Sequence, residues 1–398
     1  MREMKDSGIP WIGEIPEGWG IDTIGNLYTL RTEKVSDKDY APLSVTKMGI
    51  VPQLETAAKT DDGDNRKLVR VGDFAINSRS DRRGSCGISA YDGSVSLINL
   101  VLTPRGQMYP RFYNWLFHTE LFADEFYKWG HGIVDDLWTT RWQEMKRISI
   151  VSPSYQEQQR IAEFLDRKCA EVDEMIALQE QIIEELKAYK QSVITEAVTK
   201  GLNPAAPMRD SGIEWIGQIP EHWETAYLKR FCKVNSGREI EIELEQDSDN
   251  AVPVYGSGGV FKYTDKPQFN GEAVMFGRKG TLGKPIYVNG RFWAVDTMYY
   301  LTFGNMLEAR YCFYQLVAFN WEPYITQTAL PSIVATDIVN TSFAFPSIAE
   351  QQAIADYLDE NCADIDSLIQ TKQSKIDSLK EYKKSIIYEY VTGKREVE

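Results

Sequence analysis

One stretch of 43 residues occurs twice in this chain, and it limits what the chain can fold into. Residues 157–199 and residues 350–392 align without a gap, and 21 of the 43 positions are identical. Neither copy contains Pro or Gly, and both are rich in Glu, Lys, Gln, Ala, Leu and Ile. Such a composition predicts that each copy forms one long helix.

Apolar residues recur in both copies at alternating spacings of four and three, which is the pattern of a coiled-coil seam. The predicted helix-pair packing residues are Leu165, Cys169, Val172, Ile176, Ile183, Leu186, Leu358, Cys362, Ile365, Ile369, Ile376 and Leu379. Polar residues also share seam positions, Gln179 with Lys372 and Lys190 with Lys383, where they would fix the register. Two amphipathic helices buried in separate domains are the alternative, but the shared register favours helices that pack on each other.

The short connection after the first copy predicts the direction of the second. A helix of this length spans about 65 Å. Only 11 residues separate Thr199 from the next repeated element at Ser211, and they reach about 40 Å at most. The second helix must therefore run back along the first, so we expect an antiparallel pair with one globular unit at each end.

The remainder of the chain is also duplicated. Residues 7–19 recur as residues 211–223 with ten of 13 positions identical. Residues 20–150 and 224–345 contain short β-branched and aromatic runs broken by Gly, Asn and Asp, with a helical patch near 110–129 and near 307–319. The proposed matches between these two units are Gly72-Asp73-Phe74 with Gly271-Glu272-Ala273, Gly84–Gly87 with Gly280–Gly283, and Tyr91 with Tyr287.

These patterns predict an α+β protein: two mainly β domains with short helices, joined by two long antiparallel coiled-coil helices. The internal tandem repeat implies pseudo-twofold symmetry. The expected boundaries are 1–155 for the first domain with its N-terminal segment, 156–203 for the first long helix, 204–348 for the second domain and 349–398 for the second long helix.

Composition excludes several classes of protein. No apolar run is long enough to cross a membrane and the first residues lack an apolar signal core, so we expect a soluble, cytoplasmic protein. Five cysteines form no CxxC pair and only three His are present, which supports neither a zinc site nor a disulfide framework. The net charge is −14, but residues 20–155 carry 17 basic and 17 acidic side chains, and residues 224–348 carry 11 and 13. Any nucleic-acid surface must therefore be local to these units.

No catalytic motif is complete. Residues 278–284 resemble a phosphate-binding loop, but the first glycine of that motif is missing and Pro285 stands where Ser or Thr is required. A methyltransferase would need a glycine-rich cofactor loop and an Asn-Pro-Pro-aromatic motif, whereas Asn203 is followed by Pro-Ala-Ala. We therefore expect neither catalysis nor a cofactor on this chain.

Each β unit contains one basic loop with small residues. Small residues allow the backbone to approach a phosphate, and Arg can bind phosphate or guanine through two hydrogen bonds. A solvated surface loop is the plainer interpretation of either loop alone, but two such loops at matched places favour nucleic acid. The predicted DNA-binding residues are Arg79, Ser80, Arg82, Arg83, Ser85, Arg278, Lys279, Thr281 and Lys284.

Three duplicated features together resemble the specificity subunit of type I restriction–modification systems: the WIGxIPExW openings, the apolar-Pro-xxx-EQQ junctions at 153–166 and 346–359, and the Lys-x-Tyr-Lys helix ends. The resemblance covers essentially the whole chain. It implies two target-recognition domains, each reading half of a split DNA site, and helices that set the spacing and dock two methyltransferase subunits. It also implies restriction and translocase subunits as further partners, with S-adenosylmethionine and ATP bound by the partners, and no membrane.

A different class of protein also fits the patterns. A coiled-coil scaffold with two β units could bind proteins or glycans instead of DNA. Salt dependence separates the two, because phosphate contacts release counterions and protein contacts mostly do not.

Overall fold

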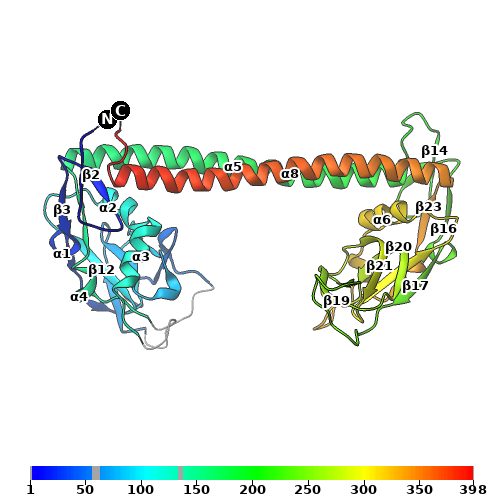
Figure 1. The fold of residues 1–398 in the computed structure, drawn as a ribbon, viewed down its shortest axis with the longest axis horizontal. Coiled ribbons are helices and arrows are strands. Elements are labelled where there is room, and N and C mark those ends of the chain that lie inside the picture. The colour runs from blue at the N-terminus through cyan, green and yellow to red at the C-terminus, as the bar shows by residue number, and fades with distance from the viewer. Residues whose placement is uncertain (1, 56–62, 133–137, 398) are drawn as a thin grey trace. The chain divides into compact units, whose positions relative to one another are not determined.

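The computed structural model describes residues 2–55, 63–132 and 138–397. The chain forms two compact units, the first built from residues 1–179 and 375–398 and the second from residues 180–374 (Figure 1). Both long helices therefore contribute one part to each unit, and each unit is described separately below.

The first unit combines a small β framework with short helices. Its strands are β1 Met4–Asp6, β2 Glu14–Pro16, β3 Gly20–Thr23, β4 Tyr28–Leu30, β5 Lys34–Val35, β6 Leu43–Thr46, β7 Gly49–Pro52, β8 Arg66–Val69, β9 Phe74–Asn77, β10 Cys86–Ile88, β11 Gly93–Val95, β12 Asn99–Pro104 and β13 Ser149–Ser152. Its short helices are α1 Ile24–Leu27, η1 Ser80–Arg82, α2 Pro110–Phe117, α3 Glu120–Lys128 and α4 Trp142–Met145. The largest sheet has the order β10-β9-β12-β4, and β11-β8-β5 form a second sheet.

The second unit is built around one larger sheet. Its strands are β14 Met208–Asp210, β15 Gln218–Pro220, β16 Glu224–Tyr227, β17 Cys232–Ser236, β18 Val252–Gly256, β19 Gly259–Thr264, β20 Phe269–Gly277, β21 Ile286–Ala294, β22 Met298–Phe303 and β23 Ser342–Phe345. Its short helices are η3 Leu228–Arg230, α6 Ala309–Ala318, η4 Glu322–Tyr324 and α7 Ala335–Val339. The six-stranded sheet has the order β17-β22-β20-β21-β18-β19.

The strand order of the two sheets is the same over four strands, with β4, β12, β9 and β10 in the places of β17, β22, β20 and β21. Phe74 pairs with Leu102 and Ile88, and Val274 pairs with Leu301 and Tyr287. The side chains of Phe74 and Val274 both face the core that contains the helix beside their sheet.

The proposed match of Phe74 with Ala273 is therefore wrong by one residue. Ala273 lies on the opposite face of its sheet, with Met275 and Tyr300. A slip of one residue along a strand exchanges the two faces, and the sequence identity at Gly72 and Gly271 could not reveal it. The match of Tyr91 with Tyr287 is wrong for a related reason, since Ile88 is the residue that takes the place of Tyr287.

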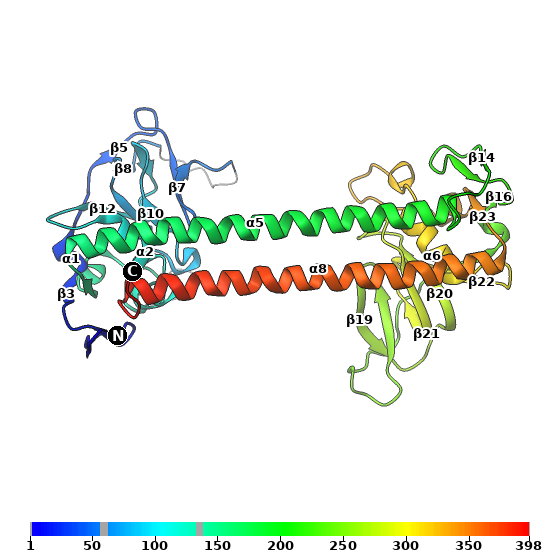
Figure 2. The same ribbon diagram turned by 90° about the horizontal axis from the view of Figure 1, so that it is seen from above.

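The long helices are α5, Tyr155–Lys200, and α8, Ile348–Val391. In each unit they lie side by side and run in opposite directions (Figures 1 and 2). The predicted α+β class with two long antiparallel helices is confirmed. The second helix ends at Val391 and not at residue 398, because Gly393 adopts a φ of +73°, in the left-handed region that ends helices.

The seam residues lie on the side of each helix that faces its partner. Nine of the twelve predicted packing residues are buried, and Ile176, Leu186 and Ile369 are half-buried. At the outer end of each pair the seam joins the core of the β unit: Ile161 and Leu165 belong to the first core, and Ile354 and Leu358 to the second. Each helix end is thus anchored by the same apolar packing that holds its β unit together.

Candidate nucleic-acid interface

The basic loop of the first unit connects β9 to β10. The backbone N–H of Ser78 donates to the carbonyl of Ile98 (3.2 Å), and the carbonyl of Ser78 accepts from Thr140 N–H (3.0 Å). Arg79 forms an antiparallel bridge with Thr139. The loop is therefore pinned to a segment that follows it by about sixty residues, and its first two residues have a fixed backbone.

The basic loop of the second unit connects β20 to β21 in the same way. Arg278 N–H donates to the carbonyl of Thr297 (2.7 Å), and its carbonyl accepts from Ile333 N–H (3.0 Å). Lys279 forms an antiparallel bridge with Ser332. Gly280 has a φ of +83°, and a Cβ there would lie 2.7 Å from the Ser257 hydroxyl oxygen, so this position needs glycine.

These contacts define which residues of the two loops are equivalent. Ser78 takes the place of Arg278, and Arg79 takes the place of Lys279. The match of Gly84–Gly87 with Gly280–Gly283 is wrong, because Cys86 and Gly87 already lie in β10 whereas Gly280–Gly283 lie before β21. The loops are at equivalent places, as expected. The position that carries a cation in both loops is occupied by Arg79 in the first and by Lys279 in the second.

The nine predicted DNA-binding residues differ in exposure. Arg82, Arg83, Arg278 and Lys284 are exposed, Arg79, Ser80, Lys279 and Thr281 are half-buried, and Ser85 is buried. Arg83 forms an ion pair with Asp124 of α3, and Arg82 lies 3.6 Å from the carboxylate of Asp81. In the described part of the chain, Arg79, Arg278, Lys279 and Lys284 take part in no ion pair. The structure brings five of the nine together on the first loop and four on the second.

Sequence reasoning missed the segments that support the loops. Residues 138–140 in the first unit and 332–333 in the second are far from the loops in the chain and have no basic signature. His131 pairs with Thr139 on the other side from Arg79 through two backbone hydrogen bonds of 3.0 Å. Only an alignment of the two halves of the chain over these segments could have pointed to them, and the two halves diverge strongly there.

The EQQ motif joins each long helix to its β unit. The Trp19 indole N–H donates to a Glu157 carboxylate oxygen (2.9 Å), and Trp223 donates to Glu350 (3.1 Å). Glu157 and Glu350 are the first residues of the duplicated motif. The motif therefore fixes the tryptophan of the WIGxIPExW segment on the helix, which explains why both motifs are duplicated together.

The first glutamine of each motif is buried and bridges two backbone groups. Gln158 accepts from the N–H of Tyr109 (2.8 Å) and donates to the carbonyl of Pro153 (2.8 Å). Gln351 accepts from the N–H of Glu308 (2.9 Å) and donates to the carbonyl of Pro346 (3.0 Å). Each glutamine thus provides a hydrogen-bond partner for a backbone N–H at the start of the short helix and for a backbone carbonyl in the turn before its own long helix.

The aspartate that ends each motif holds an aromatic residue of the short helix. Trp115 donates to Asp166 (2.9 Å), and the Tyr314 hydroxyl donates to Asp359 (2.7 Å). The duplicated positions therefore carry the same contact even where the aromatic residue differs. A joint of this kind fixes the orientation of each β unit on its own part of the helix pair.

Burial of the seam affects the two cysteines that share a position. Burial raises the pKa of Cys169 to about 11 and also raises the pKa of Cys362. Both thiols therefore remain protonated near neutral pH and act as apolar packing groups.

In the described part of the chain, no helix combines the length and apolar character that a membrane span requires.

A family model described as the type I restriction modification DNA specificity domain matches residues 220–391. The chain is 22% identical over 437 aligned positions to the putative type I restriction enzyme MjaX specificity subunit of Methanocaldococcus jannaschii, covering 96% of this chain and 95% of that protein. It is 24% identical to the MjaVIII specificity subunit of the same organism, over 63% of this chain and 62% of the relative.

Solved structures show the same fold. A chain from a type I R-M system, solved to explain its complex assembly and conformational transition, superposes with a TM-score of 0.75 at 15% identity, covering 96% of this chain and 99% of that one. The HsdS subunit from Thermoanaerobacter tengcongensis superposes with a TM-score of 0.55 at 17% identity, covering 96% and 98%.

The duplicated joints, the paired loops and these matches define a DNA specificity protein with two β units on a helix pair. More particularly, residues 220–391 match the DNA specificity domain of type I restriction–modification systems, and the chain is similar over nearly its whole length to a specificity subunit of such a system.

Proposed function

We propose that this chain is the sequence-specific DNA-recognition subunit of a type I restriction–modification complex. Each β unit reads one half of a bipartite target, and the spacer between the halves is not read. The observation that carries the proposal is the pair of equivalent loops, in which Arg79 and Lys279 hold the same place in the same backbone frame.

The backbone at the start of each loop is fixed, so Arg79 and Lys279 are held in place before DNA arrives. A preorganised Arg or Lys loses less side-chain and loop entropy on binding than one on a mobile segment. Hydrogen bonds to phosphates fix the orientation on the duplex, whereas contacts to base edges give specificity. The two units present different residues beyond the shared cation, which supports recognition of two different half-sites.

The helix pair sets the distance between the half-sites and docks two methyltransferase subunits. Restriction and translocase subunits join through the assembled complex. Methyl transfer and cleavage belong to the partners, which bind S-adenosylmethionine and ATP, so this chain is non-catalytic and works in the cytoplasm. The comparisons favour DNA specificity throughout, and no observation favours the scaffold for proteins or glycans.

Exchange of one unit tests the proposal. Residues 20–150 are replaced by the matching segment of a relative with a known target, and methylated sites are mapped in cells that also carry the methyltransferase partner. We expect one half-site to change and the other to stay. Loss of both half-sites in a complex that still assembles would contradict independent reading by the two units.

A further inference from the structure

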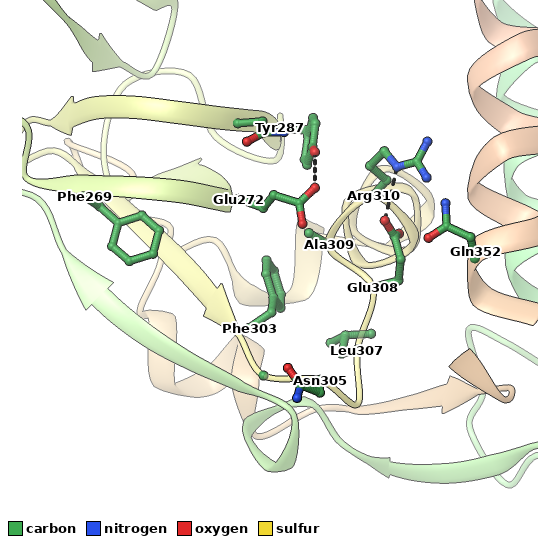
Figure 3. A pocket seen from close by; sticks show the side chains of 12 residues that line it. Phe269, Glu272, Tyr287, Phe303, Asn305, Leu307, Glu308, Ala309, Arg310 and Gln352 are labelled. Carbon is green, nitrogen blue, oxygen red and sulfur yellow. Dashed lines mark hydrogen bonds and ion pairs between the residues drawn. The ribbon is translucent and has the colours of Figure 1, made fainter. Parts of the chain in front are cut away.

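A polar pocket of about 680 Å³ lies in the second unit, between its sheet and the start of α6 (Figure 3). Strands β20 and β21 supply Glu272, Tyr287 and Asn289, and α8 supplies Gln352. Such a volume is typical of a ligand or side-chain site. None of these residues takes part in the basic loop, which lies beyond the other end of β20.

Two carboxylates line this pocket, Glu308, which contacts Arg310, and Glu272. The Tyr287 hydroxyl donates to one oxygen of Glu272 at 2.5 Å. In the described part of the chain, no Lys or Arg forms an ion pair with Glu272. Burial is the main cause that raises the pKa of Tyr287, and the hydrogen bond to Glu272 raises it further, so the hydroxyl keeps its proton and remains a donor. Tyr287 contacts one oxygen of Glu272, and the other oxygen is left for a ligand.

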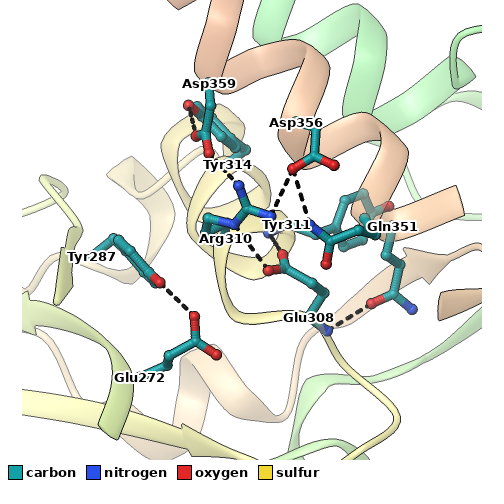
Figure 4. Close-up of polar contacts among 10 residues, drawn as sticks. Glu272, Tyr287, Glu308, Arg310, Tyr311, Tyr314, Gln351, Asp356 and Asp359 are labelled. Atoms are coloured by element: carbon teal, nitrogen blue, oxygen red, sulfur yellow. Dashed lines mark hydrogen bonds and ion pairs between the residues drawn. The ribbon is translucent and has the colours of Figure 1, made fainter. Parts of the chain in front are cut away.

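Arg310 also lines the pocket, but its guanidinium is already surrounded by three carboxylates other than Glu272 (Figure 4). The Arg310 guanidinium lies 3.1 Å from Glu308, 2.8 Å from Asp356 and 2.5 Å from Asp359. Partial burial lowers the pKa of Arg310, but these hydrogen bonds outweigh burial and raise the pKa above its ordinary value. Four carboxylates and one guanidinium leave this corner of the unit strongly negative.

The chemistry of the walls suits a flat organic cation better than a metal ion. Among the described residues, no group of three or more His, Cys, Asp or Glu is arranged to hold a metal ion. Phe303, Asn289 and Asn305 also line the pocket, as does Phe269, whose ring packs against Phe292 and Tyr300. Aromatic faces, a carboxylate and amide oxygens are the groups that bind a guanidinium in proteins.

This pocket does not belong to the duplicated frame. Phe74 of β9 takes the place of Val274, and Ile88 takes the place of Tyr287. Two residues before Phe74 the first unit has Gly72, where the second unit has Glu272. The first unit therefore lacks both the carboxylate and the hydroxyl, which indicates a role that only the second unit performs.

We propose that this pocket receives one arginine side chain of another protein chain. The guanidinium binds the free oxygen of Glu272 and lies against the ring of Phe303, which packs on the same face of the sheet as Tyr287. The inference that the pocket binds a cation depends only on the residues of the pocket. That the arginine comes from a protein rests on the proposed function, since α8, which borders the pocket at Gln352, belongs to the helix pair on which partner subunits dock.

The cation site is tested on the free, full-length chain with N-acetyl-arginine methylamide as the probe. The methyl signals of Leu307 and Ala309, which line the pocket, report binding in NMR titrations of methyl-labelled protein. We expect saturable millimolar binding, weakened about tenfold or more by Glu272→Gln, since hydrogen bonds to charged groups contribute that much. Glu245→Gln, an exposed carboxylate outside the pocket, should leave binding unchanged.

Tyr287→Phe keeps the ring and frees the first oxygen of Glu272, so it should bind the probe as well as the parent chain or better. Equal binding by Glu272→Gln, or no saturable shift in the parent chain, would overturn the site. The second measurement is the affinity of the chain for its methyltransferase partner, which Glu272→Gln should weaken and Glu245→Gln should not. Probe binding without any effect on that affinity would overturn a protein source for the arginine, whereas methylation mapping of the same variants tests DNA recognition separately.

Discussion

The ammonium group of Lys383 on α8 lies 2.6 Å from both carboxylate oxygens of Asp173 on α5. The same contact recurs in the second unit, where Lys190 of α5 lies 2.8 and 2.7 Å from the oxygens of Asp366 on α8. Each pair lies within its own unit, and in both the lysine occupies a seam position. The two lysines were expected to fix the register, and these pairs give the structural means, because a shift of either helix by one turn breaks the contact.

Reversing one charge of this pair should destabilise the helix pair, and reversing both should restore it. Lys383→Asp sets two carboxylates together, whereas Lys383→Asp with Asp173→Lys re-forms an ion pair. The coupling should be about 0.2–1 kcal/mol, since the aspartate is largely exposed. Urea unfolding of the four chains of the double-mutant cycle measures it, and additive single effects would show that the pair contributes nothing to register.

Removing Gln158, the buried glutamine of the EQQ motif, should lower the free energy of unfolding by more than the loss of that ion pair. Gln158→Ala leaves the N–H of Tyr109 and the carbonyl of Pro153 without their buried partner, at about 1–3 kcal/mol. Gln159→Ala is the matched control, because among the described residues its side chain bonds only Glu163 one turn along the same helix. Equal losses of unfolding free energy in the two variants would contradict the role assigned to the motif.

The cation common to both loops should contribute to DNA binding by the assembled complex. Arg79→Ala and Lys279→Ala should each weaken binding by about 1–3 kcal/mol if they contact bases, or reduce the salt slope by about one if they contact phosphate. Arg82→Ala with Arg83→Ala tests the exposed part of the first loop. Lys266→Ala, an exposed lysine beside Asp265, is the control. Unchanged affinity and slope for every loop variant would remove the loops from the interface.

The raised pKa of Cys169 predicts one contribution to the pH dependence of stability. Burial raises this pKa from 9.0 to about 11, so the folded chain holds this proton when the unfolded chain has lost it. The contribution is complete below pH 9 and is lost as pH rises from 9 to 11. Burial also raises the pKa of Cys86, Cys232, Cys312 and Cys362, so Cys169→Ser should reduce the slope of a stability profile measured by urea unfolding without abolishing it. An unchanged slope between pH 9 and 11 would show that Cys169 does not contribute.

The architecture could be predicted from the sequence because a long amphipathic period and a duplicated motif are non-local signals. The seam, the antiparallel direction and the two β units all follow from spacing and linker length. Strand register could not be predicted, because one residue of slip changes no composition but exchanges Ala273 and Val274 between faces. The segments around Thr139 and Ser332 could not be predicted either, since their contacts to the loops are backbone hydrogen bonds that any sequence can make.

Lengthening both helices tests whether the pair sets the spacer. One heptad inserted after Gln179 and another after Lys372 preserves the seam, because the apolar pattern repeats every seven residues. Each insertion lengthens its helix by about 10 Å. If the pair runs alongside the duplex, the preferred spacer should grow by about 3 base pairs, at about 3.4 Å per pair.

The rotation of the duplex over those base pairs is about a third of a turn, so some activity should be lost. The half-site sequences should stay the same, since no residue of either β unit has been changed. Methylation mapping of the double insertion against a library of spacer lengths gives the answer. A single-insertion variant is the control, because it leaves the two helices unequal in length and should fail at every spacer. An active double-insertion variant that keeps the original spacer would show that the helices do not set the distance.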